Sequence, residues 1–274
     1  MRIAIAGGTG VVGARAVQAA RDAGHEVVVL SRSSGVDVLD GTGLDAHLEG
    51  LDAVIDALNT SSLSLRKATE FFRATTRNLL DAEERQDVDH HVTLSIVGID
   101  GIAVSYYGAK LAQEDEARRS AVPHTIARAT QFHEFAGQLA ERTSLGPVSL
   151  IPRVLCRPVA AREVGEYLVE LAAGEPAGRA PDLVGPEEDT AAAMLRKQSD
   201  HDGTARRVLE VTLPGAYGRG LASGALRGVP EISRIGQETF AQWLESDRSG
   251  DRTRLARSPF SPTPSSPTSP PLRR

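Results

Sequence analysis

Short apolar runs alternate with longer amphipathic stretches through the first half of the chain. The runs lie at residues 3–6, 27–30, 53–58, 91–97 and 123–127, and the stretches between them include 11–23, 65–84 and 106–119. Short continuous apolar runs predict strands buried on both faces, whereas the intervening stretches are predicted to be helices. Strands that alternate with helices favour a parallel sheet covered on both sides.

Other segments carry weaker signals. We expect short strands at 36–39, 148–154 and 183–184, helices at 44–48 and 161–173, and a mixture of helices and loops over 186–245. Residues 1–245 are therefore assigned to one folded unit, whose C-terminal part, about 140–245, forms a small, mostly helical lobe. The segment 246–274 is rich in Pro and Ser, and we predict that it is disordered because it holds too few apolar residues to offset the cost of ordering.

Three glycines separate the first apolar run from the first predicted helix, and a fourth lies in the first turn of that helix. Gly7, Gly10 and Gly13 fit the pattern G-x-x-G-x-x-G, and Gly8, Gly10 and Gly13 fit G-x-G-x-x-G. Between a strand and a helix, glycines allow the backbone to approach a pyrophosphate closely, and the helix N-terminus points at it. We therefore predict an α/β fold with a Rossmann-like, doubly wound parallel sheet. Its dinucleotide loop is formed by Gly7, Gly8, Thr9, Gly10, Val11, Val12 and Gly13.

The end of the second predicted strand indicates which dinucleotide binds. Sites for NAD(H) usually place an acidic residue there to hold the ribose hydroxyls, but this strand ends in Leu30-Ser31-Arg32-Ser33. A guanidinium at this place pairs with a 2′-phosphate, so Ser31 and Arg32 favour NADP(H) over NAD(H). The alternative for Arg32 is an ordinary solvent-exposed loop charge.

Three further residues are predicted to contact the cofactor. Asp37 and Val38, in the short run after the second strand, are predicted to meet the edge of the adenine. Asn59 follows the run at 53–58 and is predicted to lie over the crevice where parallel sheets bind ligands.

Composition excludes several other classes of protein. The chain has 274 residues, a net charge of −5 and a pI near 5.8, so no broad nucleic-acid-binding surface is expected. No segment approaches the roughly 20 apolar residues of a membrane span, and the single cysteine, Cys156, fits a reducing cytosol. We expect a cytoplasmic protein that acts on a small-molecule substrate, without a membrane or nucleic-acid partner.

A tyrosine and a lysine stand at catalytic spacing in the stretch 106–119. Tyr106 and Lys110 form Y-x-x-x-K, which places both side chains on one face of a helix. An ammonium beside the phenol lowers the pKa of Tyr106 toward neutrality, and the same lysine can bind the cofactor ribose. Ser95, near the end of the run 91–97, is predicted to donate a hydrogen bond to a substrate carbonyl. Tyr107 is the alternative phenol, since only one of the two shares the face of Lys110.

Together these features resemble an atypical short-chain dehydrogenase/reductase of the NmrA-like, isoflavone-reductase-like NAD(P)H-binding family. The matching segments are the glycine loop 7–13, the strand end at Asn59, and residues 94–98, 106–114 and 127–133. The resemblance covers about residues 1–245. It implies an NAD(P)-binding Rossmann domain with a smaller C-terminal substrate lobe. It also implies a catalytic role for Ser95, Tyr106 and Lys110, although members of this family that lose the tyrosine serve as redox-sensing regulators.

Gln131 and His133, which follow the run 123–127, are assigned to the substrate pocket. The imidazole of His133 is suited to orient substrate or relay a proton because it titrates near neutrality. A hydrogen-bonded structural histidine is the alternative for His133. No metal site is predicted, because His90 and His91 have no third ligand at metal-binding spacing.

Three functions remain open on these observations. The first is NAD(P)H-dependent reduction of a small apolar carbonyl, quinone or enone, in which Tyr106 gives a proton to the forming alkoxide. The second is a non-catalytic NADP(H)-binding redox sensor that binds a protein partner. The third is an epimerase or dehydratase that uses its bound cofactor transiently.

Overall fold

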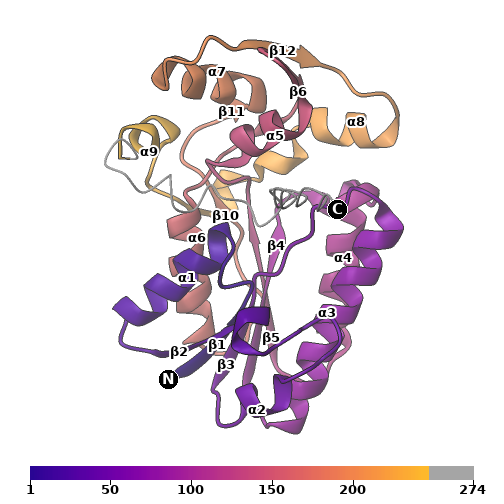
Figure 1. Cartoon of the computed structure of the whole chain (residues 1–274), viewed down its shortest axis with the longest axis vertical. Coiled ribbons are helices and arrows are strands. Elements are labelled where there is room, and N and C mark those ends of the chain that lie inside the picture. Colours follow the sequence, from indigo (N-terminus) through magenta and orange to yellow (C-terminus); the bar gives the residue numbers. More distant parts are fainter. Residues whose placement is uncertain (247–274) are drawn as a thin grey trace, which may run out of the picture.

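The alternation of strands and helices is present in the computed structural model, which describes residues 1–246 (Figure 1). The predicted tail, residues 246–274, lies outside the described residues except for its first residue. The strands of the first half are β1 (Arg2–Ala6), β2 (Glu26–Leu30), β3 (Ala53–Asp56), β4 (His90–Ile96) and β5 (His124–Ala129). The helices between them are α1 (Val11–Asp22), α2 (Leu44–Leu48), α3 (Leu65–Arg85) and α4 (Ser105–Arg119). Each was predicted from its apolar pattern, and each is confirmed to within a few residues.

The main sheet is parallel throughout its described pairings. Its strand order is β13-β10-β5-β4-β3-β1-β2, with β9 (Gly178–Arg179) also paired to β5. The two-residue strands β10 (Leu183–Val184) and β13 (Arg234–Ile235) extend the sheet beyond β5. The order in which successive strands are added reverses at β1, since β2 lies on one side of it and β3 on the other. This switch point is where doubly wound sheets bind ligands, and it confirms the predicted fold class.

Helices cover both faces of this sheet, as a buried parallel sheet requires. On one face α1 packs against α6 (Ala161–Ala172), and their apolar side chains form a core with β1, β3 and β5. On the other face α3 packs against α4, while α2 packs against α3 and β2. Helix α6 therefore lies with the main sheet although its residues fall late in the chain.

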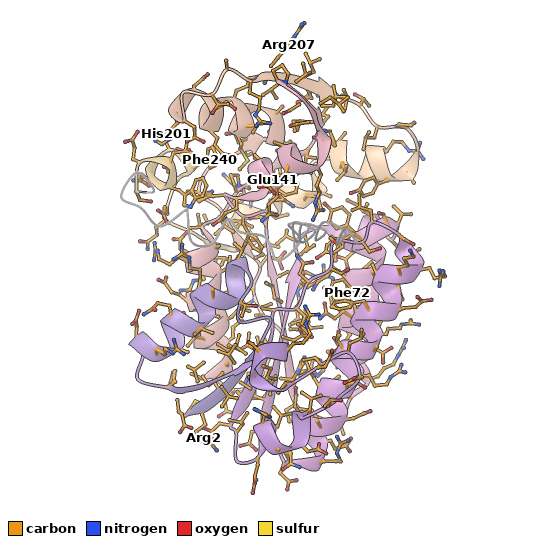
Figure 2. All side chains as sticks on the ribbon, viewed as in Figure 1. Arg2, Phe72, Glu141, His201, Arg207 and Phe240 are labelled. Carbon is orange, nitrogen blue, oxygen red and sulfur yellow. The ribbon has the colours of Figure 1, made fainter. Side chains whose placement is uncertain are left out.

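The remaining elements form a lobe above the carboxyl end of the sheet (Figure 1). Its helices are α5 (Phe135–Thr143), α7 (Ala191–His201), α8 (Gly215–Ala222) and α9 (Phe240–Ser246). A small sheet joins β6 (Ser144–Leu145), β7 (Val148–Pro152) and β12 (Arg207–Val211), and β8 (Leu155–Cys156) pairs with β11 (Asp189–Thr190). The lobe has its own hydrophobic core, to which Phe240 contributes, whereas Phe72 lies in the half that holds the main sheet (Figure 2).

One predicted strand is wrong. Residues 36–39 form a loop in which Asp37 makes only an isolated antiparallel bridge with Thr42. Val36 and Val38 are buried against the core beside β2, so their alternation reflects burial and not a strand ladder. The Asn78 side-chain amide donates to the carbonyls of Val38 and Leu39, which takes the place of a neighbouring strand.

Candidate functional site

The glycine loop joins β1 to α1 in a conformation that other residues cannot adopt. Gly7 has a left-handed φ of +79°, and a Cβ on Gly13 would lie 2.0 Å from the Gly7 carbonyl oxygen. The Gly10 N–H donates to that same carbonyl at 2.9 Å, and no side chain caps the start of α1. The N–H groups of the first turn of α1 are therefore available to an anion, and the residues fit a bound pyrophosphate.

A turn rich in hydroxyl groups follows β2. Ser34 Oγ donates to the Ser31 carbonyl at 2.7 Å, and Ser31 N–H donates to Ser34 Oγ at 3.1 Å, so the turn is closed on itself. Arg32 lies in this turn and is exposed, and its guanidinium makes no hydrogen bond or ion pair with any residue in the range 1–246. A free guanidinium beside hydroxyl groups is a set of donors suited to a phosphate.

The residues predicted to meet the adenine lie next to this turn. The Val36 N–H donates to the Ser31 carbonyl at 3.1 Å, which holds the following residues against the end of β2. The Asp37 carboxylate accepts from the Leu39 N–H at 2.9 Å, and Val38 is buried.

Tyr106 and Asn59 are brought together by the structure. The Tyr106 hydroxyl donates to Asn59 Oδ1 at 2.7 Å, and this joins the start of α4 to the loop after β3. Ser105, the first residue of α4, has a left-handed φ of +53° and donates its hydroxyl to the Leu63 carbonyl at 2.7 Å. A non-glycine residue in this region carries backbone strain, which is held here by the contact with the loop that also carries Asn59.

Aromatic rings surround the Tyr106 phenol. Its ring centroid lies 5.8 Å from that of Phe72 and 6.0 Å from that of Tyr107, which in turn lies 6.0 Å from Tyr217. Burial raises the pKa of Tyr106 above its ordinary value, so the phenol keeps its proton at neutral pH. This differs from the expectation that Lys110 lowers the pKa of Tyr106.

Lys110 is buried beneath this aromatic group. Its ammonium donates to the Leu94 carbonyl at 2.6 Å and to the side chain of Gln113, and it lies 4.7 Å from the centroid of the Phe72 ring. Burial lowers the pKa of Lys110 to about 8. Among the described residues, the ammonium therefore bonds to β4 and α4 and not to the Tyr106 phenol.

Ser95 belongs to a buried network of charges. Its hydroxyl donates to Glu114 Oε1 at 2.5 Å, and Arg128 donates to the same carboxylate at 2.7 Å from both Nε and Nη2. Arg128 also binds Asp100, with Nη2 and Oδ1 2.8 Å apart. Burial opposes ionisation of Glu114, but the bonds from Arg128 and Ser95 outweigh it and lower the pKa of this carboxyl.

Glu114, Arg128, Asp100 and Ser105 were not among the predicted site residues. The signal for Arg128 was present, because an arginine inside an apolar strand is almost never buried without a carboxylate partner. The signal for Ser105 was absent, because positive φ at a serine has no sequence pattern.

Gln131 and His133 lie between the end of β5 and the lobe. His133 is fully buried; its Nε2 lies 3.1 Å from the Glu238 carbonyl oxygen, and its ring packs against Phe240 and Trp243. Burial lowers the pKa of His133 to about 4, so the imidazole is neutral near pH 7. Gln131 is also buried, and neither atom of its side-chain amide has a hydrogen-bond partner within the described part of the chain.

Two further properties concern residues 1–246 as a whole. No described helix is both long enough and apolar enough to cross a bilayer. No three or more His, Cys, Asp or Glu side chains in this part of the chain are grouped so that they could hold a metal ion.

Comparison with known proteins agrees with this geometry. The NAD(P)H-binding family matches residues 7–173, which run from the glycine loop to the end of α6. The chain belongs to this NAD(P)H-binding family, as the resemblance to NmrA-like proteins implies. No curated protein matches the sequence.

Three solved structures share the fold at low sequence identity. An NADPH-dependent quinone oxidoreductase from Escherichia coli has a TM-score of 0.67 and 14% identity, over 89% of this chain and 98% of that one. The triphenylmethane reductase of Citrobacter sp., complexed with NADP(H), has a TM-score of 0.64 and 14% identity, over 90% and 99%. A short-chain dehydrogenase/reductase superfamily protein from Agrobacterium tumefaciens, with bound NAD, has a TM-score of 0.64 and 20% identity, over 93% and 98%.

Proposed function

We propose that the protein is an NADP(H)-dependent reductase that acts on a small apolar carbonyl, quinone or enone. The observation that carries this proposal is the Tyr106 phenol, which keeps its proton and donates it to Asn59 Oδ1 at 2.7 Å. A neutral phenol at the carboxyl end of the sheet is a suitable donor to a carbonyl oxygen that gains negative charge.

The surroundings of Tyr106 support an apolar, planar substrate. Phe72, Tyr107 and Tyr217 supply aromatic surface, while the phenol supplies a polar contact that fixes orientation. The fold is also that of an NADPH-dependent quinone oxidoreductase and of a triphenylmethane reductase.

The nicotinamide cofactor, when bound, would supply the hydride. The residues of this chain bind the cofactor, orient the substrate and protonate its oxygen. The glycine loop binds the pyrophosphate, and Tyr106 transfers its proton to the substrate oxygen. Lys110 and Ser95 act as positioning residues, since Lys110 fixes α4 to the Leu94 carbonyl and Ser95 fixes Glu114. Gln131 and His133 lie between the end of β5 and the lobe, and we place them at the border of the pocket that the nicotinamide and the substrate would share.

The preference for NADP(H) is carried by Arg32. Its guanidinium is exposed and without a partner in residues 1–246, beside the hydroxyls of Ser31 and Ser33, which lie 2.9 Å apart. No carboxylate stands at the end of β2, where sites for NAD(H) hold the ribose hydroxyls. The 2′-phosphate of NADP(H) would therefore gain donors at the place where sites for NAD(H) hold a carboxylate.

The cofactor proposal is tested by titrating NADPH and NADH against the wild type and Arg32→Ala. Charge-assisted bonds contribute about 1.5–3 kcal/mol, so NADPH affinity is expected to fall roughly 10- to 100-fold while NADH affinity stays the same. Arg21→Ala is the matched control, because Arg21 is exposed in the last turn of α1, away from the glycine loop. Equal losses for both cofactors would contradict the assignment.

A non-catalytic NADP(H) sensor is the second candidate. It is favoured by one observation: Lys110 and Ser95, two of the three predicted catalytic side chains, bond to groups inside the protein. NADPH consumption is followed with a panel of quinones, enones and aromatic carbonyls, and products are identified by mass spectrometry. A defined reduced product supports the reductase, whereas tight cofactor binding with no oxidation by any compound supports the sensor.

A further inference from the structure

Gln131 holds an unpaired amide at the carboxyl end of β5. The side chain is 8% exposed, and its Nε2 and Oε1 are both buried without a hydrogen-bond partner among residues 1–246. Its backbone carbonyl is paired, because it accepts from the Val159 N–H at 2.9 Å. A buried amide with both a donor and an acceptor unpaired is unfavourable in the folded protein, so a ligand that pairs with both groups offsets that penalty.

The strand order indicates which part of a ligand reaches Gln131. Arg32 follows β2 and the glycine loop follows β1, so the adenosine and pyrophosphate of a dinucleotide would be held over these two strands. The other half of the molecule would then reach across the switch point toward the ends of β3, β4 and β5. Asn59 follows β3 and Gln131 follows β5, so Gln131 lies on the nicotinamide side of the sheet.

We propose that the Gln131 side chain pairs with the carboxamide of the nicotinamide ring. Its Oε1 accepts from the carboxamide NH₂, and its Nε2 donates to the carboxamide oxygen. This inference rests on the proposed function, and it adds a residue that orients the ring. Two bonds to one planar group fix the rotation of the ring, and with it the ring face that is turned toward the substrate.

The hydrogen-bonding capacity of the amide favours the cofactor over the substrate as its partner. A carbonyl, quinone or enone offers acceptor oxygens alone, which would pair with Nε2 and leave Oε1 buried and unpaired. A primary carboxamide offers one donor group and one acceptor in the same plane, which is the complement of a glutamine side chain.

The test compares the binding of NADP⁺ with that of its 3-acetylpyridine analogue, in which a methyl ketone replaces the carboxamide and no N–H is left. Isothermal titration gives both dissociation constants for the wild type, Gln131→Met and Gln131→Glu. The wild type is expected to bind NADP⁺ about 10-fold more tightly than the analogue. Gln131→Met is expected to bind the two about equally. Gln131→Glu keeps an acceptor for the carboxamide NH₂ but loses the donor to the oxygen, so it is expected to bind both ligands more weakly and to keep the preference for NADP⁺.

Two controls isolate the pairing. 2′-Phospho-ADP-ribose lacks the nicotinamide, so every variant is expected to bind it as the wild type does. Gln198→Met is the matched variant, because Gln198 lies on α7 in the lobe and also has a buried side-chain oxygen without a hydrogen-bond partner in residues 1–246. It is expected to keep the wild-type preference for NADP⁺.

Different results overturn different statements. Equal wild-type affinity for NADP⁺ and the analogue, or an unchanged preference in Gln131→Met, overturns the pairing and leaves the proposed reductase intact. An effect of Gln131→Met on the KM for a carbonyl substrate alone also overturns it, and assigns Gln131 to the substrate. If the wild type binds neither NADP⁺ nor 2′-phospho-ADP-ribose, the proposed function is overturned as well.

Discussion

The hydroxyl of Tyr106 donates to Oδ1 of Asn59 at 2.7 Å, and this bond joins α4 to the loop after β3. The same Oδ1 accepts the N–H of Thr60 at 2.8 Å, which fixes the direction of the amide. The phenol proton is therefore directed to one point over the carboxyl end of the sheet. Because the pKa of Tyr106 is raised by burial, the proton stays on the phenol throughout the physiological pH range.

Removal of the Tyr106 hydroxyl is expected to stop the proposed reaction without affecting cofactor binding. Proton transfer by a positioned group contributes about 10²- to 10⁴-fold, so Tyr106→Phe is expected to lower kcat by at least 100-fold. Steady-state turnover and NADPH titration measure the two effects separately. Tyr167→Phe is the control, since Tyr167 lies on α6 and donates its hydroxyl to the Pro181 carbonyl at 2.8 Å, outside the proposed site. Full turnover by Tyr106→Phe would contradict the role of the phenol.

Asn59 is expected to act through Tyr106. Loss of one neutral hydrogen bond costs about 0.5–1.5 kcal/mol, so Asn59→Ala is expected to lower kcat by roughly 2- to 10-fold. In the Tyr106→Phe background the same substitution is expected to have almost no further effect, because its partner is already gone. Additive losses in the double variant would show that Asn59 acts independently of the phenol.

The buried amino group of Lys110 makes the free energy of unfolding vary with pH in the alkaline range. The ordinary pKa of 10.5 falls to about 8 in the folded protein, because burial disfavours the charged form. Between these values the unfolded chain holds a proton that the folded protein has released, so stability rises with pH. Relative to Lys110→Met, the wild type is expected to gain on the order of 2 kcal/mol from pH 7.5 to 10, measured by urea unfolding. A parallel pH dependence in both proteins would contradict the burial of this charge.

His133 is expected to set the loss of stability in acid. Its pKa falls from 6.5 to about 4 in the folded protein, so the unfolded chain takes up a proton first as the pH drops. Stability is therefore lost between pH 6.5 and 4, by on the order of 3 kcal/mol relative to His133→Gln. Trp243, the single tryptophan of the chain, lies 5.6 Å from the imidazole and reports this unfolding by its fluorescence. If His133→Gln loses as much stability in acid as the wild type, the loss is due to other titratable groups.

The two carboxylates that bind Arg128 are expected to contribute different amounts to the free energy of unfolding. Arg128 is 1% exposed, Glu114 is fully buried, and Asp100 is 70% exposed. Removing one partner of a buried ion pair costs about 3–5 kcal/mol, whereas an exposed pair contributes about 0–1 kcal/mol. Glu114→Gln is therefore expected to destabilise the protein far more than Asp100→Asn, as measured by chemical unfolding. Similar effects of the two substitutions would contradict this division.

The parts of the fold that could be predicted are those with local signals. Burial on both faces gives β1 to β5 their apolar runs, and the Gly7 to Gly13 spacing follows from the strand–loop–helix junction. The loop at 36–39 has the same alternation as a strand, because burial alone produces it. The short strand predicted at 183–184 is present as β10, whereas the two-residue strand β13 is too short to carry a period and only the tertiary structure places it in the sheet.

The sequence indicates candidate residues for the site but not the contacts between their side chains. A spacing of four residues places Tyr106 and Lys110 on one helical face, but it does not say which neighbour each side chain meets. Tyr106 meets the loop after β3, and Lys110 is buried against Phe72. The bond of Ser95 to Glu114 joins residues that are 19 positions apart, and no local pattern indicates such a contact.

The contact between Gly13 and the Gly7 carbonyl has a consequence for the speed of binding. A Cβ at Gly13 would lie 2.0 Å from that oxygen, so the two segments are already in close contact in the protein alone. A loop that holds its shape before the ligand arrives has little conformational entropy to lose on association. We therefore expect the rate of cofactor association to be limited by diffusional encounter and electrostatic attraction, and not by rearrangement of this loop.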